Sequence, residues 1–254
     1  MTAERTLAGV DGCRAGWLAA IEHPGKAPSI AVFTRFADLL AALPDDALIA
    51  VDMPIGLPER IDGPGRAAEK AARPHLAMRQ SSVFSIPARA AVELWPGLFH
   101  DELHRRESHA AASALARTLS DPPRGVSIQG YMLFGKILEI DALLRESPAL
   151  TERVIESHPE MAFRAMNGGV PAMRPKKVKN RPNPDGLDER EALLAVAGIS
   201  RAAFAHVPPG TGRDDLLDAL AMLVTARRHA QGLAVSYPDP PDRDAHGLPI
   251  AIRA

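Results

Sequence analysis

The chain has 254 residues, of which 46% are hydrophobic, enough to bury a sizeable core. Its formal net charge of −1 provides no global attraction to nucleic acid or to a membrane surface, so such a partner would need a local patch. A single cysteine excludes an internal disulfide, and neither a signal-peptide pattern nor an apolar run of membrane-spanning length occurs. We therefore expect a cytoplasmic protein with no membrane partner.

Two apolar runs joined by a glycine-containing turn, residues 7–21, predict an opening β-hairpin. Asp11 lies where the first buried strand reaches the edge of the sheet. A buried carboxylate is unfavourable unless it is paired, hydrogen-bonded or bound to a cation, so Asp11 indicates a site, although Asp before Gly also starts turns. Residues 29–33 predict a third strand, and residues 36–43 predict a short helix.

The continuous apolar run 48–51 predicts a strand buried on both faces, and it too ends in a carboxylate, Asp52. Two such strands indicate neighbours whose acids converge at one edge of the sheet. Residues 154–155 form another β-prone run, which ends at Glu156. Glu160 fits the first turn of a following helix, and His158 is either a proton shuttle or a hydrogen-bonded structural residue.

Residues 60–150 predict helices and loops rather than strands. In a helix, the spacing of Arg66, Lys70 and Arg73 places three cations along one stripe, which either holds phosphate or is a solvated face. Phe84 is the one aromatic residue interleaved with this basic segment, so a platform for stacking bases is not indicated. The candidate substrate-binding cations of the whole chain are Arg66, Lys70, Arg73, Arg89, Lys136, Lys176 and Lys177.

The helices predicted at residues 100–119 and 129–144 have the character of a scaffold. Their histidines lack the H-E-x-x-H spacing of a zinc helix, so we expect no zinc site. Met132 and Phe134 are candidates for the interface of a homodimer. Residues 173–181 carry five cations and no acid, which predicts a loop that either positions a polyanionic substrate or simply connects two elements.

The last informative segment begins at Thr211 and predicts a helix that extends to about His229. Thr211 and Asp214 match a capping box, which accounts for Asp214 without any chemistry. Asp215 and Asp218 share one face of this largely apolar helix, where like charges repel each other. A divalent cation between them and the strand-end acids would explain the cluster, and carboxylate oxygens select Mg²⁺ or Mn²⁺.

Several motifs in order resemble the bacterial domain-of-unknown-function family described as predicted RNase H-like nucleases, over nearly the whole chain. These motifs are residues 9–17, 51–58, 82–89, 156–160 and 214–220. The last of them also resembles the Asp-x-x-Asp-Ala-Leu-Ala helix of RuvC-type Holliday junction resolvases. By resemblance, the metal-holding positions are Asp11, Asp52, Asp215 and Asp218, whereas Glu156 has no counterpart in that pattern.

The expected fold is α/β, with an RNase H-like mixed five-stranded sheet flanked by helices, in a single domain over residues 1–254. Three antiparallel strands and a helix precede a parallel strand that carries Asp52. A helical insertion at about residues 60–150 then forms a cap over the acidic edge. A strand carrying Glu156 and the acidic helix follow, and residues 248–252 return as a small strand.

The leading functional hypothesis is a divalent-metal-dependent nuclease with a two-metal carboxylate site for Mg²⁺ or Mn²⁺. Asp11, Asp52, Asp215 and Asp218 would be catalytic, and Glu156 a further metal ligand. The substrate would be nucleic acid or another phosphodiester, and a two-fold substrate would require a homodimer.

Two other functions are open on the same fold. One is a non-catalytic protein that binds an anion or a partner. The other is an actin-like or sugar-kinase-like phosphotransferase that uses ATP, which is disfavoured because the turn after Asp11 offers no Ser or Thr to phosphate. Cys13 as a nucleophile is a remote option, because a small thiol after Gly is explained by packing.

Overall fold

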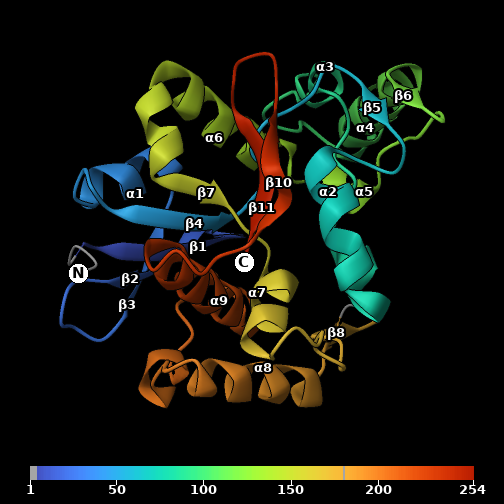
Figure 1. The fold of residues 1–254 in the computed structure, drawn as a ribbon. Coiled ribbons are helices and arrows are strands. Elements are labelled where there is room, and N and C mark those ends of the chain that lie inside the picture. The colour runs from blue at the N-terminus through green and yellow to red at the C-terminus, as the bar shows by residue number, and fades with distance from the viewer. Residues whose placement is uncertain (1–4, 180) are drawn as a thin grey trace.

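A computed structural model describes residues 5–179 and 181–254. Its centre is a five-stranded mixed sheet with the strand order β3-β2-β1-β4-β7 (Figure 1). The first three strands are antiparallel neighbours and β4 runs parallel to β1, as the sequence predicted, and β7 also runs parallel to β4. The strands are β1 (Leu7–Cys13), β2 (Gly16–Glu22), β3 (Ser29–Phe33), β4 (Leu48–Asp52) and β7 (Val154–Glu156).

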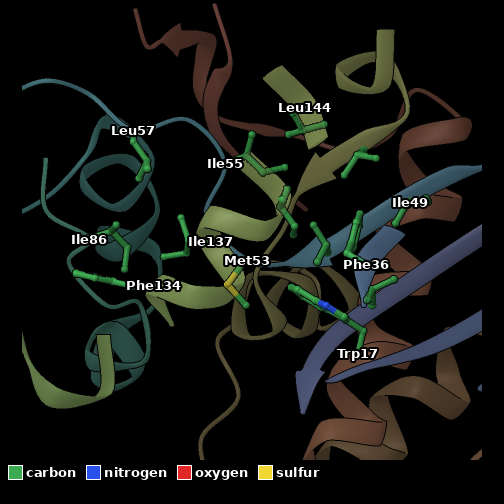
Figure 2. Close-up of a cluster of buried hydrophobic side chains, with 14 of the residues drawn as sticks. Trp17, Phe36, Ile49, Met53, Ile55, Leu57, Ile86, Phe134, Ile137 and Leu144 are labelled. Carbon is green, nitrogen blue, oxygen red and sulfur yellow. The ribbon is translucent and has the colours of Figure 1, made fainter. Parts of the chain in front are cut away.

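One face of the sheet packs on α1 (Phe36–Ala42) and α6 (Phe134–Glu146). The core on this side contains alternate residues of each strand, among them Val10 and Val51. Figure 2 shows this cluster, in which the rings of Trp17 and Phe36 meet edge to face with their centroids 5.0 Å apart. Burial of this apolar layer is the main stabilising contribution on this side.

The other face of the sheet is covered by α9 (Arg213–Ala230), which packs along β1 and β4. Behind α9 lie α7 (Pro159–Met166) and α8 (Pro184–Val196) (Figure 1). Gly9 permits this close packing, because a Cβ there would overlap the backbone of Ala219 and Leu223. The residues that alternate with Val10 and Val51 therefore face α9, and these include Asp11 and Asp52.

The segment between β4 and β7 is mostly helical, as predicted, and the structure adds two short strands that pair in parallel. Its elements are β5 (Ile61–Asp62), α2 (Ala67–Ala72), η1 (Arg73–His75), η2 (Ala77–Ser82), α3 (Arg89–Val92), α4 (Glu102–Thr118), β6 (Ser120–Asp121), α5 (Ile128–Tyr131), α6 and η3 (Pro148–Glu152). The helix predicted at 129–144 is divided in two at Met132 and Leu133. Phe134 is fully buried, so of the two candidate interface residues only Met132 reaches the surface.

The C-terminal segment forms a hairpin of β10 (Ser236–Arg243) and β11 (Pro249–Arg253). The strand predicted at 248–252 is confirmed, whereas its partner is hidden in the sequence by a run rich in proline and aspartate. The cation-rich segment 173–181 contributes to a second small hairpin, β8 (Lys177–Val178) with β9 (Arg181–Pro182). The short helix η4 (Arg201–Phe204) follows α8. Among the described helices, none combines the length and apolarity needed to cross a membrane.

Candidate functional site

Two carboxylates meet at the end of the central parallel strands. β1 and β4 pair in register, which sets Asp11 directly opposite Asp52 on the α9 side of the sheet. Both side chains follow fully buried residues, Val10 and Val51, so a strongly hydrophobic strand carries each of them to the edge. The convergence predicted from the two strand ends is therefore present.

Asp218 on α9 faces the same edge and completes a cluster of three carboxylates, which we call the acidic edge (Asp11, Asp52 and Asp218). Asp218 is 5% exposed. Its Oδ2 accepts a hydrogen bond from Nζ of Lys176, whereas its Oδ1 is buried without any hydrogen-bond partner among the described residues. A buried carboxylate oxygen without a donor is unfavourable, so this atom is an unused acceptor that a ligand from outside the chain would satisfy.

The carboxyl groups of the acidic edge are harder to ionise than ordinary aspartates. Burial raises the pKa of Asp11 well above its ordinary value, and the neighbouring charges of Asp52 and Asp218 raise it further. Burial and the charge of Asp218 raise the pKa of Asp52 to about 8. Burial raises the pKa of Asp218 to about 6 although the ammonium of Lys176 opposes the shift. Such mutual repulsion would be relieved by a bound cation.

Lys176 is the cation that the chain itself supplies to the acidic edge. Burial lowers its pKa, but the carboxylates of Asp218 and Glu160 outweigh burial and raise the pKa above its ordinary value. Lys177 lies next to it, with its Nζ 2.5 Å from Asp214 Oδ2. Within residues 5–179 and 181–254, no three His, Cys, Asp or Glu side chains converge closely enough to hold a metal ion. With the side chains in these positions, Asp218 of the acidic edge is already paired with Lys176.

Asp215 caps the N-terminus of α9 with one of its carboxylate oxygens. The helix starts one residue later than the Thr211 capping box implied, and the N–H of Gly212 donates to Asp215 Oδ2 at 2.8 Å. The capping role predicted for Asp214 therefore belongs to Asp215, and Asp214 instead pairs with Lys177. Asp215 still adds negative charge near Asp11 and raises its pKa.

Glu156 lies on the opposite side of the sheet from the acidic edge. It follows Val154 by two residues, and Val154 belongs to the core that contains α6. Both of its carboxylate oxygens accept hydrogen bonds from Arg66, and one also accepts from the N–H of Ile55 at 2.7 Å. The metal-ligand role predicted for Glu156 is thus replaced by an internal ion pair.

Arg66 is the centre of that internal pairing, the Arg66 cluster (Arg66, Glu69 and Glu156). Its guanidinium lies 2.7 Å from Glu69 and 2.6 Å from Glu156, with all three side chains buried. Arg66 precedes α2 in extended backbone, so the predicted stripe of three cations does not form. Arg89 is likewise buried, with its guanidinium on Asp141 and Asp244. Neither arginine is free to bind substrate.

The remaining predicted cations occupy varied positions. Lys70 is exposed and donates to the backbone of Asp62. Arg73 is half-buried and holds the loop that follows η2 through bonds to Val83 and Ser85. Lys136 lies 4.4 Å above the ring of Trp17 and donates to the carbonyl of Gly16, so it fastens the first hairpin to α6.

Two acidic-edge neighbours whose roles the sequence left open are structural. His158 caps α7 by accepting from the N–H of Glu160, and burial lowers its pKa to about 4, which keeps the ring neutral. Both carboxylate oxygens of Glu160 accept from Arg190, at 2.7 and 2.8 Å. The position of His158 just before a proline was the signal for a helix cap. The Arg190 pairing left no signal in the sequence.

The family model described as "Protein of unknown function (DUF429)" matches residues 9–243, which include Asp11, Asp52 and Asp218. The chain belongs to the DUF429 family. Comparisons with curated proteins and with solved structures gave no match.

Two hollows adjoin the acidic edge of this DUF429 chain. The first is lined by Asp11 and Asp52, by the Arg66 cluster and by apolar side chains that include Met53, Phe84 and Leu133. The second contains the acids Asp52, Glu160 and Asp214 together with the cations Arg79, Lys176 and Lys177. The strand-end carboxylates thus border a partly apolar hollow and one of mixed charge, and Phe84 lines both hollows. The sequence gave Phe84 little weight because its neighbours in the fold were not visible there.

Proposed function

We propose that this DUF429 chain is a divalent-metal-dependent nuclease on an RNase H-like fold. The observation that carries the proposal is the acidic edge, in which two strand-end carboxylates in register face a third whose Oδ1 is buried without a partner among the described residues. Three antiparallel strands followed by two parallel strands that end in acids support the RNase H-like assignment. Carboxylate oxygens are the ligands that Mg²⁺ and Mn²⁺ prefer.

The donor set fits such an ion in its chemistry. Asp11, Asp52 and Asp218 would hold the metal, with Asp215 adding charge beside them. Burial raises the pKa of all three carboxylates, the charges of Asp52 and Asp218 raise that of Asp11 further, and a bound dication would favour the ionised forms. Because Lys176 occupies Asp218 Oδ2, binding requires this lysine to move away from the carboxylate.

When bound, the metal would supply a water of lowered pKa and stabilise the leaving oxygen. The chain's own groups would place the substrate. Lys176, once it leaves Asp218, and Lys177 lie in the same hollow as Asp52, where each ammonium would bind a non-bridging phosphate oxygen. Met53 and Leu133 form an apolar wall beside Asp11 and Asp52 and would limit access of bulk water.

A second function, a non-catalytic protein that binds an anion, is favoured by one specific observation. The ammonium of Lys176 already neutralises Asp218, and no ready-made group of three metal ligands occurs in the described part of the chain. In that case Lys176 and Lys177 would bind the anion, and the acidic edge would only hold Lys176 in place.

Titration of Mn²⁺ into metal-free protein by calorimetry separates the two functions. The nuclease proposal predicts stoichiometric binding to the wild type, loss of binding in Asp11→Asn and full binding in Asp62→Asn, an exposed carboxylate on β5. It also predicts cleavage of DNA or RNA that needs Mn²⁺ or Mg²⁺ and disappears in Asp11→Asn. Absence of Mn²⁺ binding in folded wild-type protein would support the anion-binding function instead.

A further inference from the structure

Phe84 is an exposed aromatic side chain on a loop that is otherwise firmly held. Its neighbours along the chain, Val83 and Ile86, are 5% and 1% exposed, whereas Phe84 is 37% exposed. An apolar pair of anchors thus fixes the loop to the protein, and the ring between them remains at the surface.

The backbone on both sides of Phe84 is held by hydrogen bonds. The guanidinium of Arg73 donates to the carbonyl of Val83 at 2.9 and 3.1 Å and to the hydroxyl of Ser85 at 2.7 Å. On the other side, a ring nitrogen of His158 lies 3.3 Å from the carbonyl of Ser82. Because the loop is held in this way, little conformational entropy of its backbone would be lost when a ligand binds to the ring.

Phe84 borders three hollows at once. One contains Asp11 and Asp52, the second contains Lys176 and Lys177, and the third contains Arg73. Figure 1 shows the chain after α2 running towards β8, so the loop and the basic hairpin lie on the same side of the molecule.

Two of the cations around Phe84, Arg73 and Arg79, pair with no carboxylate of the described residues, whereas Lys176 and Lys177 share their hollow with Asp52, Glu160 and Asp214. The four hydrogen bonds from the guanidinium of Arg73 go to uncharged oxygens, so none of them neutralises its charge. Nε of Arg79 is buried without a hydrogen-bond partner among the described residues. An aromatic face between such cations is the arrangement that binds a nucleotide strand, with the base on the ring and the phosphates on the cations.

We propose that Phe84 is the stacking platform for one unpaired base of a single-stranded nucleic acid, whose backbone passes the cations beside it. The inference rests on the proposed function, because it names the substrate class of the same site. Stacking on Phe84 requires a base that is not engaged in a duplex, so the preferred substrate is single-stranded.

The test measures binding without cleavage, by fluorescence anisotropy of labelled oligonucleotides in EDTA at low ionic strength. We expect Phe84→Ala to bind a single-stranded oligonucleotide about tenfold more weakly than the wild type, and Phe84→Trp to bind it as well as the wild type. Leu98→Ala, which truncates another exposed apolar side chain, should bind like the wild type. Deoxyribose and ribose strands form separate arms that distinguish DNA from RNA.

An abasic oligonucleotide of the same length isolates the stacking contribution. The wild type and Phe84→Ala should bind this strand equally, and the added Trp fluorescence of Phe84→Trp should be quenched by the normal strand but not by the abasic one. Equal binding of the normal strand by wild type and Phe84→Ala would overturn the inference, as would absence of binding. Phe84-dependent binding without any metal-dependent cleavage would instead overturn the nuclease proposal alone.

Discussion

Two buried charged clusters lie on opposite sides of the same sheet edge, and they differ in how their charges are matched. In the Arg66 cluster, the guanidinium bonds both carboxylates and also the carbonyls of Ile55 and Gly56. In the acidic edge, the ammonium of Lys176 is the one cation that lowers the pKa of Asp11, and Asp218 Oδ1 has no partner in the described part of the chain. Matched charges of the first kind hold a fold together, whereas unmatched charges of the second kind suit the binding of a ligand.

The largest expected effect comes from breaking the matched cluster. Arg66→Met leaves the carboxylates of Glu69 and Glu156 buried without a counter-ion, and we expect the free energy of unfolding to fall by about 3–5 kcal/mol. Urea denaturation followed by circular dichroism measures this loss. Arg35→Met, which breaks an exposed pair with Asp38, is the matched control and should leave the unfolding curve unchanged. A small loss in Arg66→Met would show that the cluster is not structural.

Removing one ionisable group from the acidic edge should stabilise the metal-free protein, by an amount that depends on pH. The pKa of Asp52 is about 8 in the folded state against 3.8 ordinarily, so the folded state holds this proton more tightly. The stability that the proton contributes is complete below about pH 4 and is lost as the pH rises to about 8. Asp52→Asn avoids this loss, so its free energy of unfolding at pH 8 should exceed that of the wild type by on the order of 2–5 kcal/mol.

Urea denaturation at several pH values between 5 and 8.5 in EDTA tests this expectation. The difference between Asp52→Asn and wild type should grow with pH, whereas Asp62→Asn should give no such trend. A difference that stays constant across the range would mean that Asp52 titrates in the folded protein as it does in the unfolded chain.

Lys176 provides a third test of the difference between the two clusters. Lys176→Met removes the positive charge that occupies Asp218, and we expect the affinity for Mn²⁺ to rise about tenfold. Lys177→Met removes the same charge from a half-exposed pair with Asp214 and should change the affinity less. Calorimetry compares the two variants. Weaker Mn²⁺ binding in Lys176→Met would show that the lysine assists the ion rather than excluding it.

The smallest effect concerns Asp215, which the sequence assigned to the metal site and the structure uses to begin α9. Asp215→Ala removes the acceptor for the N–H of Gly212, and we expect a loss of about 1 kcal/mol in the free energy of unfolding. Thermal unfolding in EDTA measures it, with Asp214→Ala as the neighbouring control. If Asp214→Ala is the more destabilising, the cap is at Asp214 as the sequence suggested.

Much of the acidic edge was predictable because strands carry a short-range signal. Apolar runs ending at Asp11 and Asp52 indicated two neighbouring strands, and the structure pairs these residues in register. The sequence also implied that Asp11 and Asp52 lie on the same face of the sheet, because side chains alternate along a strand. Counting from Val154 to Glu156 would have placed Glu156 on the face away from Asp11, yet a strand of three residues gave too weak a pattern for that count.

The sequence by itself determined the five strands of the central sheet, the acidic helix and the convergence of carboxylates, since each depends on a period of two or 3.6 residues that nearby positions encode. Only the tertiary structure decided which charges are matched. Arg66 and Glu156 are 90 positions apart, and Lys176 and Asp218 are 42 apart, so no local period relates them. The pairing of buried charges depends on which distant segments fold against each other. For this reason the sequence did not show that Arg66 is structural or that Lys176 pairs with the acidic edge.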